Sequence, residues 1–190
     1  MNTLNTLNPS SDNTIEFALG HSSLGEVLLA MSPHGVCAIA LGDHADSLIN
    51  AFKHKHPDAQ LQADKPLLQQ HLATVIAFIE SPQQDLDLPL DVRGTIFQQQ
   101  VWQALKTIPL GTTASYTVIA KRIDQPSAVR AVAAACAANP LALVIPCHRV
   151  ITSDGNLSGY RWGVARKAEL LRREAQAVVS DGDNSHTIAD

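Results

Sequence analysis

The amino-acid sequence predicts a mixed α+β (α/β) fold, in which a small sheet with helices precedes a mainly helical second half. Three observations carry this prediction. Short apolar runs of strand length come first, two segments with helical apolar spacing follow them, and the second half consists of short helical segments separated by turn residues. Hydrophobic residues make up 45% of the 190 residues and charged residues 17%, which is typical of a folded globular protein.

Three strands are predicted near the N-terminus, over residues 14–20, 26–32 and 36–42. The turn signals HSSLG and PHG join them, and each run is rich in apolar residues. Cys37 falls in the third strand, where we expect it to act as a small buried hydrophobic residue. The polar residues 1–13 before the first strand are predicted to be a disordered start.

Two helices are predicted to cover this sheet. The first begins near Asp43 or Asp46, either of which is a suitable cap, and runs to about Lys55. The second spans about 66–80 and carries a broad apolar stripe.

A proline-punctuated stretch after the second helix is predicted to separate two domains. We place the linker at 87–94, between a small N-terminal domain (14–86) and a C-terminal domain (95–176). The remaining residues, 177–190, are predicted to be a disordered tail.

Charge is divided unevenly between the two halves. Residues 1–93 carry four Lys or Arg and eleven Asp or Glu, whereas residues 94–175 carry ten and four. The last fifteen residues add three Asp. A basic half beside an acidic half suggests a polyanionic partner for the basic half. The alternative is a chance dipole with solvated faces.

The second half contains a pattern that is typical of a helix-turn-helix. A helix over 97–106 is followed by a short helix over 116–123, the turn DQPS and an alanine-rich helix over 128–139. The alanines make a slim helix that can approach a duplex backbone closely, with Arg130 as the long cationic side chain of its first turn. The alternative is an ordinary helical hairpin that uses alanine for close packing.

The apolar run 141–145 is predicted to be a strand that brings Cys147, His148 and Arg149 to one edge of the core. Imidazole and cationic neighbours lower the pKa of a thiol, and the thiolate is the nucleophilic form. His148 can serve as its base only if the chain turns after Cys147 or a water bridges the two groups, because strand neighbours point to opposite faces. Four carboxylates could orient the histidine: Asp124, Asp154, Glu169 and Glu174. The alternative is a buried structural cysteine.

Two elements complete the prediction. The segment 152–163 (TSDGNLSGYRWG) is a loop long enough to fold over a pocket. A last helix spans about 164–175, with Leu170 and Leu171 directed inward and a basic outer face.

Cysteine and histidine usage argues against a disulfide framework or a metal site. Cys37, Cys136 and Cys147 are odd in number and lack CxxC spacing, and the histidines at 54, 56 and 71 do not complete a ligand set. The N-terminus does not have the pattern of a signal peptide, and apolar stretches stay short of the roughly 18 residues of a membrane helix. We therefore expect no metal, no cofactor, no membrane partner and a cytoplasmic location.

The motif IPCHRV, preceded by Asn139 and the VRAVAAAC helix, resembles the O6-alkylguanine-DNA alkyltransferases, or methylated-DNA–protein-cysteine methyltransferases. The likeness covers roughly 94–175 and looks closest to the C-terminal half of the family's bacterial Ada branch. Residues 14–93 look like the ribonuclease-H-like part that precedes it there. The resemblance implies that the helix-turn-helix belongs to a winged-helix-like domain that binds DNA and carries the catalytic cysteine.

The resemblance also implies an activity. The protein would flip O6-methylguanine out of duplex DNA and transfer the methyl group irreversibly, once per molecule, to Cys147. Activity on O4-methylthymine is left open. The implied partner is double-stranded DNA containing O6-alkylguanine, and we expect a monomer. The sequence lacks the phosphotriester domain and second helix-turn-helix of the Ada branch, so we expect repair without transcriptional activation by that route.

Roles follow by matching positions. Cys147 matches the alkyl acceptor, His148 the base that deprotonates it through a water, and Glu174 the carboxylate that orients the imidazole. Asn139 matches the residue that braces the turn before the active-site segment. Tyr116 matches the tyrosine that assists extrusion and donates toward the departing guanine. These five are the expected catalytic residues.

The resemblance assigns further residues to DNA and to the substrate pocket. Arg130 matches the arginine that fills the space of the extruded nucleotide. The expected DNA contacts are Arg130, Tyr116, Ala128, Gln125 and Ser153. The expected pocket residues are Tyr160, Arg161, Trp162 and Val150. Arg161 and Trp162 stand where some family members have smaller residues, so we predict a tight pocket that favours methyl over bulky adducts. The alternative for Trp162 is packing against the final helix.

Three other classes of protein fit the sequence less well. A non-catalytic alkyltransferase-like binder has tryptophan in place of Cys147. A transcription regulator needs side chains that read base edges, which an alanine-rich helix offers sparsely. A cysteine hydrolase would turn over repeatedly and would want a more separated cysteine and histidine.

Overall fold

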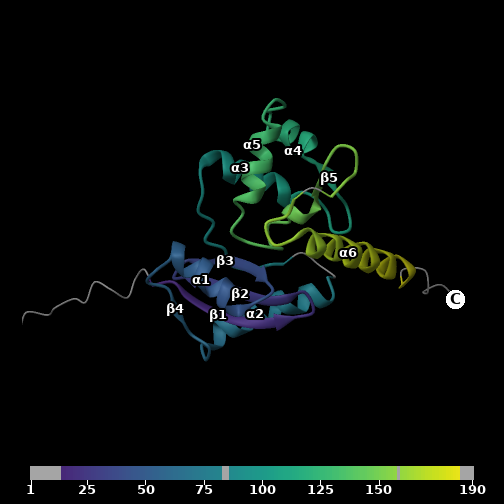
Figure 1. Cartoon of the computed structure of the whole chain (residues 1–190). Helices are drawn as coiled ribbons and strands as arrows, with labels where there is room; N and C mark the ends of the chain where they lie inside the picture. The colour runs from purple at the N-terminus through teal and green to yellow at the C-terminus, as the bar shows by residue number, and fades with distance from the viewer. Residues whose placement is uncertain (1–13, 83–85, 158, 185–190) are drawn as a thin grey trace, which may run out of the picture.

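The computed structural model describes residues 14–82, 86–157 and 159–184, so the start expected at 1–13 lies outside it (Figure 1). A sheet lobe comes first and a helical lobe second, and α6 lies between them. The elements are, in chain order, β1 (Glu16–Ser22), β2 (Gly25–Ser32), β3 (Gly35–Gly42), α1 (Ala45–Lys55), β4 (Gln60–Leu61), α2 (Pro66–Glu80), α3 (Ile96–Lys106), β5 (Ala114–Ser115), α4 (Tyr116–Arg122), α5 (Val129–Ala137), the 3-10 helix η1 (Cys147–Arg149), β6 (Val150–Ile151) and α6 (Val164–Asn184).

The sheet has the strand order β3-β2-β1-β4. The first three strands form an antiparallel meander, and β4 pairs in parallel with β1. Alternate residues face opposite sides. Ala18, Val27 and Leu29 pack with α2, whereas Phe17 and Leu28 pack with α1. Both faces of the sheet are therefore buried, which explains why its strands read as nearly continuous apolar runs.

The outer edge of β3 is covered by two segments from later in the chain. Val36 donates its backbone N–H to the carbonyl of Pro89 at 2.7 Å, so the expected linker packs on the sheet. Ile39 donates to the carbonyl of Pro140 at 2.9 Å and accepts from the N–H of Ala142 at 3.0 Å. These bonds attach the start of the cysteine-bearing segment to the sheet lobe and also pair an edge that would otherwise be exposed.

The helical lobe is built from short, capped helices. The N-cap Thr95 forms a capping box with Gln98 at the start of α3, and Ser115 caps α4. Trp102, in the centre of α3, donates its indole N–H to the carbonyl of Ala135 on α5 at 2.8 Å. This bond satisfies the polar end of a large buried ring and fixes the two helices relative to each other.

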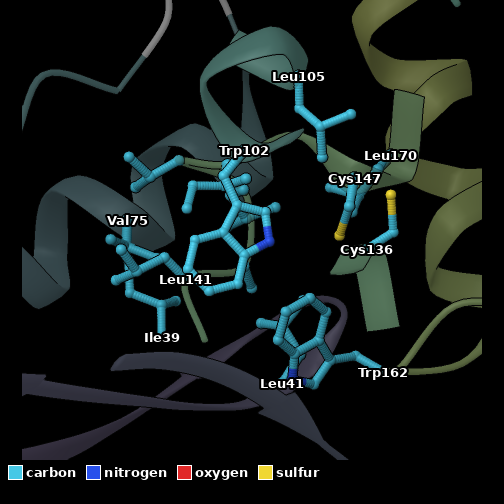
Figure 2. Close-up of a cluster of buried hydrophobic side chains, with 14 of the residues drawn as sticks. Ile39, Leu41, Val75, Trp102, Leu105, Cys136, Leu141, Cys147, Trp162 and Leu170 are labelled. Atoms are coloured by element: carbon cyan, nitrogen blue, oxygen red, sulfur yellow. The ribbon is translucent and has the colours of Figure 1, made fainter. Parts of the chain in front are cut away.

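One apolar core runs through both lobes. Figure 2 shows Ile39 and Leu41 of β3 in the same cluster as Trp102, Trp162 and Cys147. Because this cluster crosses from the sheet to the helices, the two lobes support each other mainly through burial of apolar surface.

The structure corrects three expectations. The run 141–145 is not a strand: after one bridge at Leu141 it forms turns, with Leu143 at φ 71°. The last helix continues past 175 to Asn184, so residues 177–184 are helical rather than a disordered tail. Val178 lies against Gly111, a tertiary contact that supports the extra turns.

The third correction concerns the start of α1. Its N-cap is His44, and Asp46 lies in its first turn, where a carboxylate interacts favourably with the helix dipole. The structure also contains the two-residue strand β4, which is too short to read from periodicity. No helix in the described part of the chain has the length and apolar character needed to cross a membrane.

Candidate active site

Cys147 is presented by a strained turn instead of a strand end. The N–H of Val144 bonds to the carbonyl of Ala142 at 2.8 Å around Leu143, whose positive φ is costly for a residue with a side chain. The N–H of Cys147 then bonds to the carbonyl of Ile145 at 2.7 Å, and η1 begins. The chain therefore turns at Cys147, which is one of the two conditions under which His148 could serve as its base.

Asn139 fixes this turn and contacts the thiol. Its amide Nδ2 donates to the carbonyl of Ile145 at 2.8 Å and lies 3.2 Å from Sγ of Cys147. Its Oδ1 accepts the N–H of Leu141 at 2.8 Å. The side chain is fully buried, so each of these bonds satisfies a group that has little access to water.

His148 and Glu174 form a buried pair behind the cysteine. Nε2 of His148 lies 2.7 Å from Oε1 of Glu174, and both side chains are fully buried. A carboxylate can only accept, so this contact requires Nε2–H as the donor. Nδ1 of His148 is then the basic nitrogen, and among the described residues it is buried without a hydrogen-bond partner. The neutral imidazole is thus set in the tautomer that can take up a proton on Nδ1.

Arg149 holds the same carboxylate from another side. Its Nε lies 3.0 Å and 3.2 Å from the two oxygens of Glu174, and its Nη2 lies 3.1 Å from Oε1. Nη1 donates to the carbonyl of Ile108 at 2.6 Å. The N–H of Gly111 adds a further contact to Oε2 at 3.3 Å. These donors keep Glu174 ionised although it is buried, so the ion pair is compensated on both sides.

The pKa shifts indicate that Cys147 is a neutral thiol, His148 a neutral imidazole and Glu174 an ionised carboxylate. Burial raises the pKa of Cys147 to about 11, against smaller lowering effects of the bond from Asn139 and the charge of Lys167. Burial also lowers the pKa of His148 below its ordinary 6.5, which outweighs the effect of Glu174. Burial favours the neutral form of Glu174, but His148 and Arg149 prevail, and its pKa is lowered. The thiol of Cys147 and the imidazole of His148 are therefore both neutral at neutral pH.

Lys167 supplies a buried positive charge near the thiol. Its Nζ donates to the carbonyl of Val150 at 2.5 Å, and the residue is fully buried. Burial lowers the pKa of Lys167, and the thiols of Cys147 and Cys136 act in the opposite direction. A cation in this position favours the charged form of Cys147.

A cavity of about 450 Å³ opens onto the thiol. It is lined by residues of α4, α5, η1 and the loop before α6, namely Tyr116, Ala133, Cys136, Ala137, Cys147, Gly159, Tyr160 and Arg161. The lining is mostly apolar, and the hydroxyl of Tyr160 is buried without a hydrogen-bond partner in the described part of the chain. Burial raises the pKa of Tyr160 well above its ordinary value, so the phenol remains a donor. Such a cavity fits a flat group with a few acceptors.

Residues 159–163 are named the lid loop, and its first three residues, Gly159, Tyr160 and Arg161, line the cavity. Arg161 donates through Nη1 to the backbone carbonyl of Asn139 at 3.0 Å, so the lid is tied to the residue that holds the thiol. Trp162 packs edge-on against Tyr160, with ring centroids 5.1 Å apart. Both Trp162 and Val150, which we expected in the pocket, are buried in the core.

The residues expected to contact DNA lie on the outside of α4, α5 and a nearby loop. Arg130 is exposed on the first turn of α5, and Ala128 is the N-cap of that helix. Gln125 is exposed in the turn before it. The hydroxyl of Ser153 lies 3.2 Å from that of Thr117 on α4. These residues surround neither the thiol nor the carboxylate, whereas Tyr116 lines the cavity itself.

Three residues at the site were not given a role by sequence reasoning. They are Arg149, Lys167 and Cys136. A helical signal for Lys167 was present, because residues 167, 170 and 174 lie on one face of the last helix at i, i+3 and i+7. Arg149 and Cys136 have no comparable signal, since their partners come from distant segments.

Comparison with known proteins relates this geometry to a family. Residues 96–176 match the family model of the 6-O-methylguanine DNA methyltransferase, DNA binding domain. The bifunctional transcriptional activator/DNA repair enzyme Ada of Escherichia coli (strain K12) is 55% identical over 162 residues, which are 85% of this chain and 46% of that protein. The inducible methylated-DNA–protein-cysteine methyltransferase of Bacillus subtilis (strain 168) is 39% identical over 132 residues, which are 70% and 74%. The chain thus spans less than half the length of Ada.

Solved structures agree with these matches. The Mycobacterium tuberculosis O6-methylguanine methyltransferase superposes with a TM-score of 0.75 at 33% identity, over 86% of this chain and 94% of that one. The M. tuberculosis OGT in complex with DNA gives 0.73 at 33% identity, over 85% and 94%. Fold and site together define an α+β protein in which a buried cysteine is followed in the chain by a histidine paired with a buried carboxylate. The chain belongs to the methylated-DNA–protein-cysteine methyltransferase family.

Proposed function

We propose that this protein repairs O6-methylguanine in duplex DNA by transferring the methyl group to its own Cys147, once per molecule. The observation that carries the proposal is the arrangement of one cysteine, at the base of a mostly apolar cavity, next to a neutral His148 whose Nε2 is held by Glu174. The relatives that share the fold are named for this reaction.

The tautomer of His148 determines which nitrogen accepts the thiol proton. Cys147 gives up its proton to Nδ1 of His148 through a water molecule, and Glu174 stabilises the imidazolium that forms. The positive charge of Lys167 and the amide of Asn139 favour the developing thiolate. Because burial raises the pKa of the thiol to about 11, the thiol is neutral at rest and His148 has to take its proton during the reaction.

Methyl transfer is an in-line displacement. A bond forms between Sγ of Cys147 and the methyl carbon, and the bond from that carbon to O6 breaks. The electron pair remains on guanine, which takes up one proton to balance the one lost from Cys147 and stays in the DNA strand as the normal base. The hydroxyls of Tyr160 and Tyr116 are the donors we assign to the departing base, because both residues line the cavity. The thioether left on Cys147 is inert, so the reaction is irreversible.

DNA is engaged by α4 and α5, which we assign as a helix-turn-helix in a winged-helix-like domain. Asp124, at φ 57°, makes the tight turn between the two helices, and the exposed first turn of α5 carries Arg130. Phosphate contacts from this basic half would give salt-sensitive binding. Arg130 enters the duplex and replaces the flipped nucleotide, while Gln125, Ala128 and Ser153 contact the strands.

The sheet lobe is assigned as the ribonuclease-H-like domain. Its antiparallel β1–β3 meander, followed by β4 in parallel with β1, supports that assignment. We keep the boundary between the two domains at 87–94. We further propose that the protein acts as a monomer in the cytoplasm, where its three thiols stay reduced.

Titration with excess substrate tests the proposal. The protein is incubated with increasing amounts of duplex oligonucleotide that contains O6-methylguanine, and restored guanine is counted. We expect one guanine per protein molecule and no second round of repair after the DNA is replaced. Restoration of several guanines per molecule would indicate a hydrolase, and tight binding without restoration would indicate a lesion binder.

A further inference from the structure

Arg166, in the first turn of α6, contacts three separate parts of the fold. Its Nε donates to the carbonyl of Leu24, in the turn between β1 and β2, at 2.7 Å. Its Nη1 donates to the carbonyl of Trp162 in the lid loop at 2.8 Å, and its Nη2 bonds to Oδ1 of Asp43, just after β3, at 2.5 Å. One planar guanidinium thus joins the lid loop to two corners of the sheet lobe.

We propose that Arg166 is the positioning residue of the lid loop and that the sheet lobe sets the shape of the substrate cavity through it. This inference rests on the proposed function, since the lid is a lid only if the cavity takes a flipped base. The side chain of Arg166 retains 15% of its exposure, so its bonds to the two carbonyls are made largely out of water.

The lid loop is short enough to transmit the contact. The N–H of Gly163 bonds to the carbonyl of Tyr160 at 2.9 Å, so residues 160–163 form one turn. Gly163 adopts φ 101°, which favours glycine, and a Cβ there would lie 3.5 Å from Nη1 of Arg166. A turn in which Arg166 binds the carbonyl of Trp162 also holds Tyr160, a lid residue that lines the cavity.

A second contact places the lid on the same lobe. Trp162 belongs to the same core cluster as Leu41 of β3 (Figure 2). Arg166 binds the carbonyl of Trp162, and the ring of Trp162 packs in the core that includes β3. The backbone and the side chain of Trp162 are therefore both held by contacts with the sheet lobe. The next residue along the lid, Arg161, donates to the carbonyl of Asn139 and so links the lid loop to the residue that contacts the thiol.

Of the three contacts of Arg166, the ion pair with Asp43 contributes least to holding the lid loop. The side chain of Asp43 is 79% exposed, and exposed pairs stabilise by only about 0–1 kcal/mol. The two backbone carbonyls are therefore the specific acceptors. A lysine keeps the charge but cannot present three donors in one plane, and a methionine keeps only the apolar stem.

Three arginines on α6 provide a matched set of variants. Arg166→Met removes the lid contact. Arg173→Met removes a different contact between the lobes, the bond from Nη1 to the carbonyl of Ile79 at 2.6 Å. Arg172→Met removes an exposed arginine that pairs with Glu169 on the same helix. Arg166→Lys tests partial rescue.

Two measurements are made on the full chain. Amide hydrogen exchange of the peptide covering 159–163 reports lid order without any reaction. Single-turnover methyl transfer, followed as a function of DNA concentration, separates capture of the lesion from the limiting rate of transfer. Thermal melts of all four variants control for loss of fold.

We expect Arg166→Met to speed exchange at Gly163 and to weaken lesion capture about tenfold, the factor that loss of one hydrogen bond to a charged group corresponds to. The limiting rate of transfer should change less. Arg166→Lys should fall between the unmodified protein and Arg166→Met in exchange and in capture. Arg173→Met should lower the melting temperature without altering exchange or capture. Arg172→Met should leave the melting temperature, exchange and capture unchanged.

The inference is overturned if Arg166→Met matches Arg173→Met in lid exchange and in capture. Failure of the unmodified protein to transfer any methyl group would instead overturn the proposed function, and the exchange result would still be read independently.

Discussion

The carboxylate of Glu174 joins His148 and Arg149 in one buried cluster: Nε2 of His148 lies 2.7 Å from Oε1, and Nε of Arg149 lies 3.0 Å from Oε2. The first contact selects the imidazole tautomer, and the second keeps the carboxylate charged. Orientation of the base and compensation of a buried charge therefore depend on the same side chain.

Glu174→Gln should impair both roles. The amide retains the shape but loses the charge, so Arg149 is left uncompensated and His148 loses its fixed tautomer. We expect the rate of methyl transfer to fall about 10²- to 10⁴-fold, the usual share of general-base catalysis. Stability should fall by about 3–5 kcal/mol, the cost of breaking a buried pair. Single-turnover rates and urea unfolding measure the two effects. Glu169→Gln, on the exposed side of the same helix, is the control, and equal effects in both variants would contradict this assignment.

The pH dependence of the rate should follow the lowered pKa of His148. Below that pKa the imidazole is protonated and cannot accept the thiol proton, so the rate is lost on the acid side. Because burial depresses the pKa, we expect the rate to stay constant as pH falls through 6.5 and to decline only at more acidic pH. A rate that is already halved at pH 6.5 or above would show that His148 is not the group being titrated.

Stability should change with pH in the same sense. The unfolded chain binds a proton on His148 at about pH 6.5, whereas the folded chain binds it at lower pH. Between the two values the unfolded state holds more protons, so stability rises with pH across that window and is complete above 6.5. Urea unfolding at several pH values, compared between the unmodified protein and His148→Gln, measures this contribution, which should be absent in the variant.

Arg130→Ala should damage repair of duplex DNA while leaving the fold intact. The side chain is exposed at the start of α5, and exposed substitutions change stability by about 0.5 kcal/mol or less. Without the inserted cation the extruded nucleotide is not replaced in the stack, so we expect transfer from duplex DNA to fall at least about tenfold. Reaction with free O6-methylguanine needs no extrusion and should be unchanged. A parallel loss with the free base would remove Arg130 from the DNA-binding role.

Adduct size should depend on Arg161 more than on Trp162. Arg161 lines the cavity, so Arg161→Ala widens it, and we expect the benzyl-to-methyl rate ratio to rise about tenfold, a discrimination that pocket size alone can supply. Trp162 is buried in the core, and Trp162→Ala should instead cost about 3–5 kcal/mol of stability. Competition between methylated and benzylated oligonucleotides, with thermal melts alongside, distinguishes the two. A ratio that is equal to one in the unmodified protein would contradict the tight pocket.

The regular elements were largely predictable because their signals are local. The predicted helix over 66–80 coincides with α2, where Pro66 starts the helix and apolar residues recur on one face. The helix over 97–106 begins one residue earlier than expected, at Ile96, after the capping box of Thr95. Strand ends moved by one or two residues, which local patterns do not define.

The site was less predictable because its geometry is set by distant contacts. An apolar run such as 141–145 suits a strand or a buried turn equally. The first residues pair with Ile39 of β3, which donates to the carbonyl of Pro140, but the N–H of Val144 then bonds to the carbonyl of Ala142 and closes a turn. Burial also reversed one expectation: neighbouring cations suggested a lowered pKa for Cys147, whereas desolvation raises it to about 11. Sequence separation hides such partners, as it hid the contact of Arg149 with Glu174.

Transfer of labelled methyl to one cysteine tests the central claim most directly. Duplex oligonucleotide carrying O6-methylguanine with a labelled methyl group is incubated with the protein, which is then digested and its peptides are analysed. We predict one label per molecule, on the peptide that contains Cys147, and no label in Cys147→Ala. Label on a peptide with Cys37 or Cys136, or label that persists in Cys147→Ala, would contradict the account.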